Sequence, residues 1–202
     1  MEQHLIVVAH PVEDSFTMSV TRTYVGELIR AGHDVRVHDL YRMGFDPVLS
    51  ARELVDGHDV RIRMVDVLVA QEDVLEADVV TVIYPLWWMA MPAMMKGYID
   101  RVFSRGFAYE AEQGKVRGLL AGRRAAVVTV SGAPLAALVE DGRWQAMQVL
   151  QDSNILRAAG FELVGHLHFD EVGPALSPAD ACTDFARVRA FVRGHFASVS
   201  AA

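Results

Sequence analysis

The chain has 202 residues, of which 52% are hydrophobic, and this content excludes an intrinsically disordered protein. A net charge of −7, from 19 basic and 26 acidic side chains, disfavours nonspecific binding to nucleic acids or anionic membranes. The single cysteine, Cys182, excludes an internal disulfide and any multi-cysteine metal or iron–sulfur site. We expect one domain over residues 1–202.

The ends and the apolar runs of the sequence predict where the protein resides. The chain starts with a strand-like run, HLIVVA, and lacks the charged segment of a signal peptide. No apolar run approaches the roughly 20 residues needed to span a bilayer. These features predict a cytoplasmic protein without membrane insertion.

Strand-like and helix-like segments alternate along the chain. Short β-branched runs predict strands at residues 5–9, 35–38, 79–83, 125–130 and 162–168. Helical spacing predicts helices at residues 16–31, 51–76, 92–103, 144–159 and 178–196. Gly32 and Gly160, each followed by a strand, are expected to end helices. This alternation is typical of an α/β fold with helices on both faces of a parallel sheet, and five such units suit the strand order 2-1-3-4-5.

The loop after the first strand, residues 10–17, is a candidate anion site. It leads into a helix, whose first N–H groups have no partner within the helix. Ser15 and Thr17 add hydroxyl groups. The loop lacks both G-x-G-x-x-G and the lysine of a P-loop, which argues against a dinucleotide Rossmann fold or a nucleotide triphosphatase. The alternative is that Ser15 only caps the helix.

The loop after the third strand carries two adjacent tryptophans, Trp87 and Trp88. Loops at the carboxyl ends of strands are where open α/β sheets bind ligands. Two exposed indoles are costly unless something flat covers them. The alternative is that the indoles are core or dimer-interface residues, and for Trp88 the two interpretations are evenly balanced.

This stretch closely resembles the flavodoxin-like NAD(P)H:quinone oxidoreductases. The shared pattern is a Pro-Leu-x-Trp element, a Pro-Ala-x-x-Lys-Gly helix start and an Asp-Arg-Val-Phe continuation, and it falls here on Pro85, Leu86, Trp87, Trp88, Pro92, Ala93, Lys96, Gly97, Asp100, Arg101, Val102 and Phe103, with Phe107, Ala108 and Tyr109 after it. At lower stringency, AHPVEDSF at residues 9–16 is similar to the family's first phosphate loop, DLYRMGFDPVLS at 39–50 to the segment after its second strand, and TVSGAP at 129–134 to its Thr-Thr-Gly-Gly loop.

The resemblance implies a flavodoxin-like three-layer sandwich that binds FAD or FMN, with FAD slightly favoured. The implied contacts to the flavin phosphates come from His10, Ser15, Phe16 and Thr17. Those to the flavin ring come from Pro85, Leu86, Trp87, Trp88, Met89, Thr129, Ser131 and Gly132. The implied reaction is hydride transfer from NAD(P)H through flavin N5 to a quinone or related acceptor, by a ping-pong mechanism.

The sequence departs from the family at the substrate side. The tyrosine and histidine that assist hydride transfer in larger relatives are missing from residues 131–148, and Ala111 replaces a further aromatic residue. We therefore expect no histidine that supplies a proton to the acceptor, and Tyr109 becomes the candidate catalytic residue. Azo or nitroaromatic reduction, or a role as ancillary flavoprotein of an ion-efflux system, are the alternative functions.

Two further expectations concern partners and metals. The resemblance implies a homodimer whose neighbouring subunit completes the quinone pocket. The apolar groups Tyr41, Trp87, Trp88, Met89 and Met91 would be left exposed in a monomer. His166 and His168 alternate on the last strand, but without a carboxylate or cysteine at suitable spacing they predict a polar strand end rather than a metal site.

Overall fold

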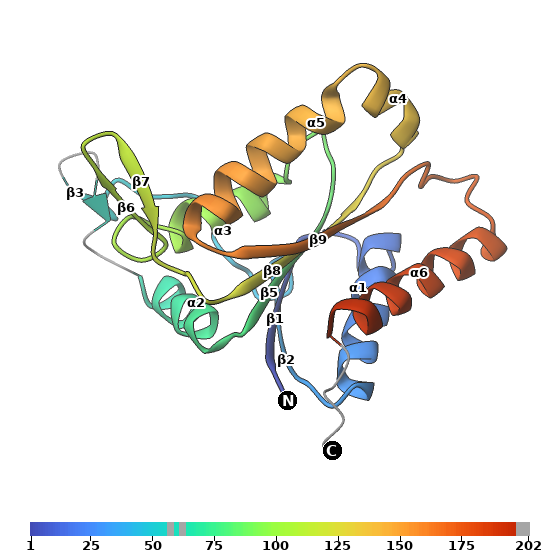
Figure 1. The fold of residues 1–202 in the computed structure, drawn as a ribbon, viewed down its shortest axis with the longest axis horizontal. Coiled ribbons are helices and arrows are strands. Elements are labelled where there is room, and N and C mark those ends of the chain that lie inside the picture. Colours follow the sequence, from blue (N-terminus) through green and yellow to red (C-terminus); the bar gives the residue numbers. More distant parts are fainter. Residues whose placement is uncertain (56–58, 61–63, 197–202) are drawn as a thin grey trace.

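The computed structural model describes residues 1–55, 59–60 and 64–196 and is built around one parallel sheet (Figure 1). Its strands are β1 (Gln3–Val8), β2 (Asp34–Asp39), β5 (Val79–Pro85), β8 (Arg124–Val130) and β9 (Glu162–Phe169), in the order β2-β1-β5-β8-β9. Numbered by strand, this is the predicted order 2-1-3-4-5. The central β5 is buried at every position, which explains its uninterrupted apolar sequence.

Helices cover both faces of the sheet (Figure 1). On one face α1 (Phe16–Arg30) and α6 (Pro178–Phe196) share a core with alternate residues of β1 and β8. On the other face lie α2 (Val65–Glu76), α3 (Ala93–Val102), α5 (Arg143–Met147) and the π-helix η1 (Gln148–Arg157). The predicted three layers are confirmed.

The two predicted helix-ending glycines are confirmed. Gly32 and Gly160 have φ angles of 84° and 103°, in the left-handed region. At Gly32 the N–H groups of the glycine and of His33 bond back to the carbonyls of Ile29 and Leu28, which closes a Schellman motif.

The predicted helix over residues 51–76 is wrong in its first half. Only α2 is helical, and β3 (Leu54–Val55) and β4 (Asp59–Val60) form an antiparallel pair before it, while residues 56–58 and 61–63 lie outside the described residues. Tertiary contacts override the helical periodicity: buried Glu53 accepts hydrogen bonds from Ser50 and, at 2.9 Å, from Nε of Arg101 on α3.

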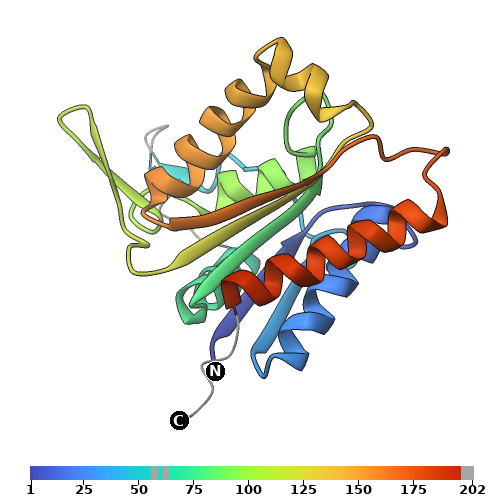
Figure 2. The ribbon, with the colours of Figure 1, turned by 45° about the vertical axis from the view of Figure 1, so that its right-hand side comes forward.

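A further hairpin and a short helix were also not predicted. An antiparallel hairpin of β6 (Tyr109–Glu112) and β7 (Lys115–Gly118) extends away from the sheet in Figure 2. A short helix, α4 (Leu135–Glu140), precedes α5. The predicted helix over residues 144–159 is present, but most of it is π-helical. Among the described residues no helix combines the length and apolarity that crossing a membrane requires.

Candidate functional site

A hollow of about 200 Å³ opens at the carboxyl ends of β1, β5 and β8. These strands are neighbours in the sheet, so the loops that follow them meet although they lie far apart in sequence. The hollow is lined by His10, Ser15, Phe16, Thr17, Pro85, Leu86, Trp87, Val130, Ser131, Gly132 and Val172. All three loops singled out from the sequence therefore line one cavity, and Val172 joins them from the segment after β9.

The first loop presents the start of α1 to the hollow. Ser15 is the N-cap, and its Oγ accepts a hydrogen bond from the N–H of Met18 at 3.2 Å. The next two residues, Phe16 and Thr17, begin the helix, so their N–H groups have no carbonyl partner within it. The helix dipole adds partial positive charge at the same place. This end of α1 can therefore bind an anion.

Arg42 lies against the same loop and was not singled out from the sequence. Its guanidinium donates to the carbonyl oxygens of His10 and Pro11, at 2.5 and 3.1 Å. These bonds hold the loop and place a permanent positive charge beside it, in a chain that is acidic overall. The segment that contains Arg42, DLYRMG, resembles the family's segment after the second strand, but the resemblance assigned no role to Arg42.

The tryptophan loop turns tightly. Trp87 and Ala90 exchange two backbone hydrogen bonds, of 3.1 and 3.0 Å, around a two-residue turn. The central residues, Trp88 and Met89, have φ angles of 55° and 59°. Large side chains rarely adopt this left-handed conformation, which costs about 1–3 kcal/mol per residue. The π-helix supports the turn, because Nε2 of Gln151 donates to the Met89 carbonyl at 2.9 Å.

The turn separates the two indoles. Trp87 lines the hollow with 43% of its surface exposed, and its ring lies 6.0 Å from that of His10. Trp88 is fully exposed and points away from the chain's own core. Neither Trp88 nor Met89 is part of the lining.

Thr129 lies behind the hollow rather than in its wall, and it is completely buried. Its hydroxyl contacts two imidazoles, Nε2 of His166 at 2.7 Å and Nδ1 of His168 at 2.8 Å. The other nitrogen of His168 reaches Oγ of Ser131 at 3.2 Å, and the other nitrogen of His166 reaches Oδ2 of Asp152 at 2.7 Å. A continuous hydrogen-bonded chain thus connects buried Asp152 with Ser131 in the wall of the hollow.

Burial shapes the electrostatics of this chain of groups. Burial and the neighbouring His166 lower the pKa of His168 to about 4, so its ring is neutral near pH 7. The indole of Trp144 packs on both imidazoles, with ring centroids 5.0 Å from His166 and 4.7 Å from His168. Burial, and to a smaller extent Asp152, raise the pKa of Tyr84, whose hydroxyl donates to Oε1 of Gln151 at 2.9 Å.

Besides His10, the structure brings a second histidine to this site, where the sequence predicted none that could supply a proton to the acceptor. His168 comes from β9, beyond the segment in which the family's histidine was sought, and its contact with Ser131 brings it to the hollow. The pairing of β8 with β9 sets Thr129 opposite His168, a register that the sequence alone does not show. Without the strand register, the histidines looked like a polar strand end.

Tyr109 does not line this hollow. It is at the start of β6 and lines a second hollow of about 340 Å³, formed by α3, the hairpin and the end of η1. The two hollows have no lining residue in common. Within one chain Tyr109 is therefore not in the wall of the first hollow.

Comparisons with known proteins agree with this architecture. The chain is 34% identical over 171 residues to a Haemophilus influenzae protein named uncharacterized NAD(P)H oxidoreductase, covering 82% of this chain and 84% of that one. It is 34% identical to human ribosyldihydronicotinamide dehydrogenase (quinone) over 144 residues, which span 63% of this chain and 62% of the human protein. Among solved structures, NAD(P)H:quinone oxidoreductase from Methanothermobacter marburgensis superposes with a TM-score of 0.82 at 27% identity, over 96% of each chain. Residues 2–190 match the family described as Flavodoxin-like fold, and the chain therefore belongs to this flavodoxin-like family.

Proposed function

We propose that the protein is a flavin-dependent NAD(P)H:quinone oxidoreductase and that the hollow binds the flavin. The observation that carries the proposal is the convergence of three loops with the open end of α1 on one cavity. The names of the relatives, NAD(P)H oxidoreductase and quinone dehydrogenase, support the reaction class. A flavin bound there would accept two electrons from a nicotinamide and pass them to a quinone.

The donors around the hollow suit the two parts of a flavin. The N–H groups of Phe16 and Thr17 and the Ser15 hydroxyl would hold phosphate, because Ser15 accepts its cap bond through oxygen and keeps its own proton to donate. The Trp87 turn and the Ser131–Gly132 segment would hold the ring, since they line the same cavity from the ends of the two following strands of the sheet, β5 and β8. Arg42 would add long-range attraction for phosphate.

We expect the purified protein to bind FAD or FMN with one flavin per chain, and Ser15→Ala to weaken that binding about 5- to 30-fold. The reason is the loss of a charge-assisted hydrogen bond to phosphate, worth about 1–2 kcal/mol, while the backbone donors remain. Flavin absorbance and fluorescence titrations measure the affinity, and chromatography of the released cofactor identifies it. Absence of a spectral or melting-temperature shift with either flavin would contradict the proposed function.

Ser177 provides a matched control because it caps α6 in the same way, accepting from the N–H of Asp180 at 3.1 Å. Ser177→Ala should lose a comparable helix cap, at a cost of about 1 kcal/mol of stability, and leave flavin affinity unchanged. Equal flavin affinities in the two variants would show that Ser15 serves only as a cap.

The chain from Asp152 to Ser131 would supply the proton that quinone reduction consumes. The net reaction of NAD(P)H, one proton and a quinone gives NAD(P)⁺ and a hydroquinone, so each turnover takes up one proton. In one arrangement Ser131 donates to His168, His168 to Thr129, and Thr129 to His166, while His166 donates to the Asp152 carboxylate. Every bond then carries one proton and both imidazoles are neutral.

If the three hydrogen bonds between Ser131 and His166 reverse their direction, the network holds one more proton. His166 becomes an imidazolium between Asp152 and Thr129, Thr129 donates to His168, and His168 donates to Ser131. Ser131 can accommodate this change because its hydroxyl has a second acceptor, the Ala133 carbonyl at 2.9 Å. The two arrangements differ by one proton, which enters or leaves at Ser131 and is stored on His166 opposite Asp152.

We also propose that the active protein is a homodimer. Trp88 is fully exposed, and Val149 and Leu150 on the neighbouring π-helix are 60% and 63% exposed. Such groups are typical of a surface that a second copy covers. The sequence had predicted Tyr41 and Met91 on this surface as well. Tyr41 is partly buried, but Met91 is only 8% exposed and does not belong to the surface. A second subunit would also allow Tyr109 to reach the hollow of its partner.

Light scattering should therefore give twice the mass of the chain, and Trp88→Lys should yield a monomer, because a charged group cannot be buried there without a partner. Quinone turnover should fall with the loss of the dimer. Ile29→Lys, at a 59% exposed position on α1, is the control and should leave the mass unchanged. A fully active monomer would exclude the composite site.

A further inference from the structure

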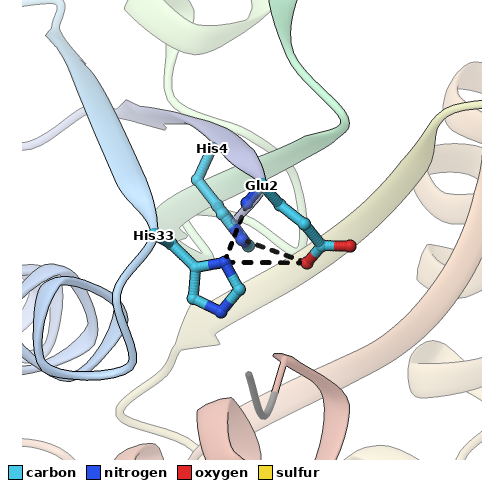
Figure 3. Close-up of side chains that lie close together, drawn as sticks. All are labelled: Glu2, His4 and His33. Carbon is cyan, nitrogen blue, oxygen red and sulfur yellow. Dashed lines mark hydrogen bonds and ion pairs between the residues drawn. The ribbon is translucent and has the colours of Figure 1, made fainter. Parts of the chain in front are cut away.

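Three side chains with metal-binding atoms meet at the amino-terminal end of β1, opposite the end that leads to the hollow (Figure 3). Oε2 of Glu2 lies 3.7 Å from Nε2 of His4 and 3.8 Å from Nδ1 of His33. The three ligand atoms lie within 4.8 Å of one another. Glu2 and His4 are two residues apart on an extended chain and share a side of it, and the turn at Gly32 brings His33 back to them.

His4 is the most unusual member of this cluster. It is 2% exposed, and among the described residues neither of its ring nitrogens has a hydrogen-bond partner. An imidazole buried without partners is costly, because both polar atoms have lost water. A neutral imidazole binds a metal through the lone pair of one ring nitrogen. Nε2 points toward the carboxylate of Glu2 (Figure 3).

His33 is already oriented as metal ligands usually are. Its Nε2 lies 2.6 Å from the carbonyl oxygen of Phe196 and must carry the proton of that bond. Nδ1 then presents its lone pair to the cluster, where it accepts a long hydrogen bond of 3.3 Å from the Glu2 N–H that a metal ion would have to replace (Figure 3). A backbone carbonyl that fixes the tautomer of a histidine is a common support for metal-binding imidazoles. The same bond connects the cluster to the end of α6.

Glu2 completes the set and provides access. Its Oε1 accepts from Nη2 of Arg124 at 2.5 Å, which leaves Oε2 facing the imidazoles. The side chain is 34% exposed, so a cation can enter from solvent. Arg124 opposes a cation, but Asp78, which accepts from the N–H of Gln3 at 2.8 Å, supplies a compensating negative charge nearby.

We propose that Glu2, His4 and His33 bind a divalent transition metal, zinc being the best match to two imidazoles and a carboxylate. Tetrahedral zinc at about 2.0–2.2 Å from each ligand requires ligand atoms about 3.3–3.5 Å apart, so the side chains must close by roughly half an ångström around Glu2 and the two imidazoles by up to about 1.5 Å. Water would fill the fourth position. The metal would join the start of β1, the turn before β2 and the end of α6, far from the hollow, and would stabilise the fold.

Zinc added to protein stripped with a chelator tests this proposal. We expect one zinc per chain after dialysis, and a melting temperature raised by about 5–10 °C at a hundredfold excess over Kd. Glu2→Gln and His33→Gln should each lower zinc affinity about 10- to 100-fold. Glu13→Gln, an exposed carboxylate outside the cluster, is the control and should bind zinc as before.

X-ray absorption at the zinc edge should show nitrogen and oxygen ligands that include two imidazoles. Failure to retain zinc, or equal affinity in both cluster variants and the control, would overturn the proposal. Flavin affinity should be the same with and without zinc, so this experiment and the test of the proposed function fail independently.

Discussion

In metal-free protein, the free energy of unfolding should be lower at pH 5 than at pH 8 by about 4 kcal/mol, because His4 and His168 are buried as neutral rings. Each has a pKa of about 4 in the folded protein, against 6.5 when unfolded. Between these values the unfolded chain binds more protons, so stability is lost as the pH falls from about 6.5 towards 4. Each ring contributes about 2 kcal/mol of the loss at pH 5, a large share of the 5–15 kcal/mol typical of a domain.

The charged groups around the two rings leave this direction intact. His4 faces His33 and Arg124, which disfavour protonation, and Glu2 and Asp78, which favour it, but burial dominates. At His168, burial, His166 and Arg187 oppose protonation, and Asp170 favours it.

His38 is a third buried histidine, and burial and the neighbouring Arg36 lower its pKa, but it adds less to the loss than the other two rings. Its Nε2 lies 2.7 Å from a carboxylate oxygen of Asp73, a contact that stabilises the protonated ring and opposes the effect of burial.

Urea titrations at pH 8 and pH 5 in the presence of EDTA measure this difference. His4→Leu removes one of the two rings and should reduce the difference to about 2 kcal/mol. A free energy of unfolding that stays constant from pH 8 to pH 5 would show that these rings are protonated without cost in the folded protein.

Thr129→Val should slow the quinone-dependent half-reaction about 100-fold, because the hydroxyl is the only link between His166 and His168 in the chain of groups that reaches Ser131. Positioned proton donors typically contribute 10²–10⁴-fold. Thr129 is completely buried and does not line the hollow, so flavin affinity should change little. Stopped-flow measurements separate the quinone-dependent step from reduction by NAD(P)H.

Thr81→Val is the matched control for this experiment. Thr81 is equally buried on β5, and its hydroxyl bonds to that of Tyr24 at 3.1 Å, away from the hollow. It should lose similar stability and keep its quinone rate. A normal quinone rate in Thr129→Val would indicate water as the proton source, and a slow rate in Tyr109→Phe instead would restore Tyr109 to the role that the sequence predicted.

The three central strands, β1, β5 and β8, were predictable because each is a short apolar run that matches its buried position. β5 illustrates this, since every residue of DVVTVI after the aspartate is buried. The loops at its end were predictable because Pro85 and Pro92 limit the chain on both sides of the indoles. Features that depend on contacts between distant residues could not be predicted from local patterns. One is the segment before α2, where the bond from Arg101 to Glu53 holds the chain in a non-helical conformation.

The candidate site also has parts that the sequence could predict and parts that it could not. Ser15 and Trp87 could be predicted because each lies directly after a strand, within a recognisable segment. The network behind Ser131 could not, because it depends on the register of β9 against β8 and on the wide turns of η1, which bring Asp152 to His166. Neither the register nor the π-helical winding has a clear signal in the residues themselves.

The left-handed turn at Trp88 and Met89 also sets a limit on protein engineering. Glycine adopts this conformation without steric cost, so the turn is one of the easiest places in the chain at which a substitution could gain thermal stability. It is also the segment that borders the hollow and presents a fully exposed indole. Selection for heat resistance alone would therefore favour changes that remove the side chains with which this turn contacts ligands or a second subunit. A stabilised variant of this enzyme should be sought with Trp88 and Met89 held constant.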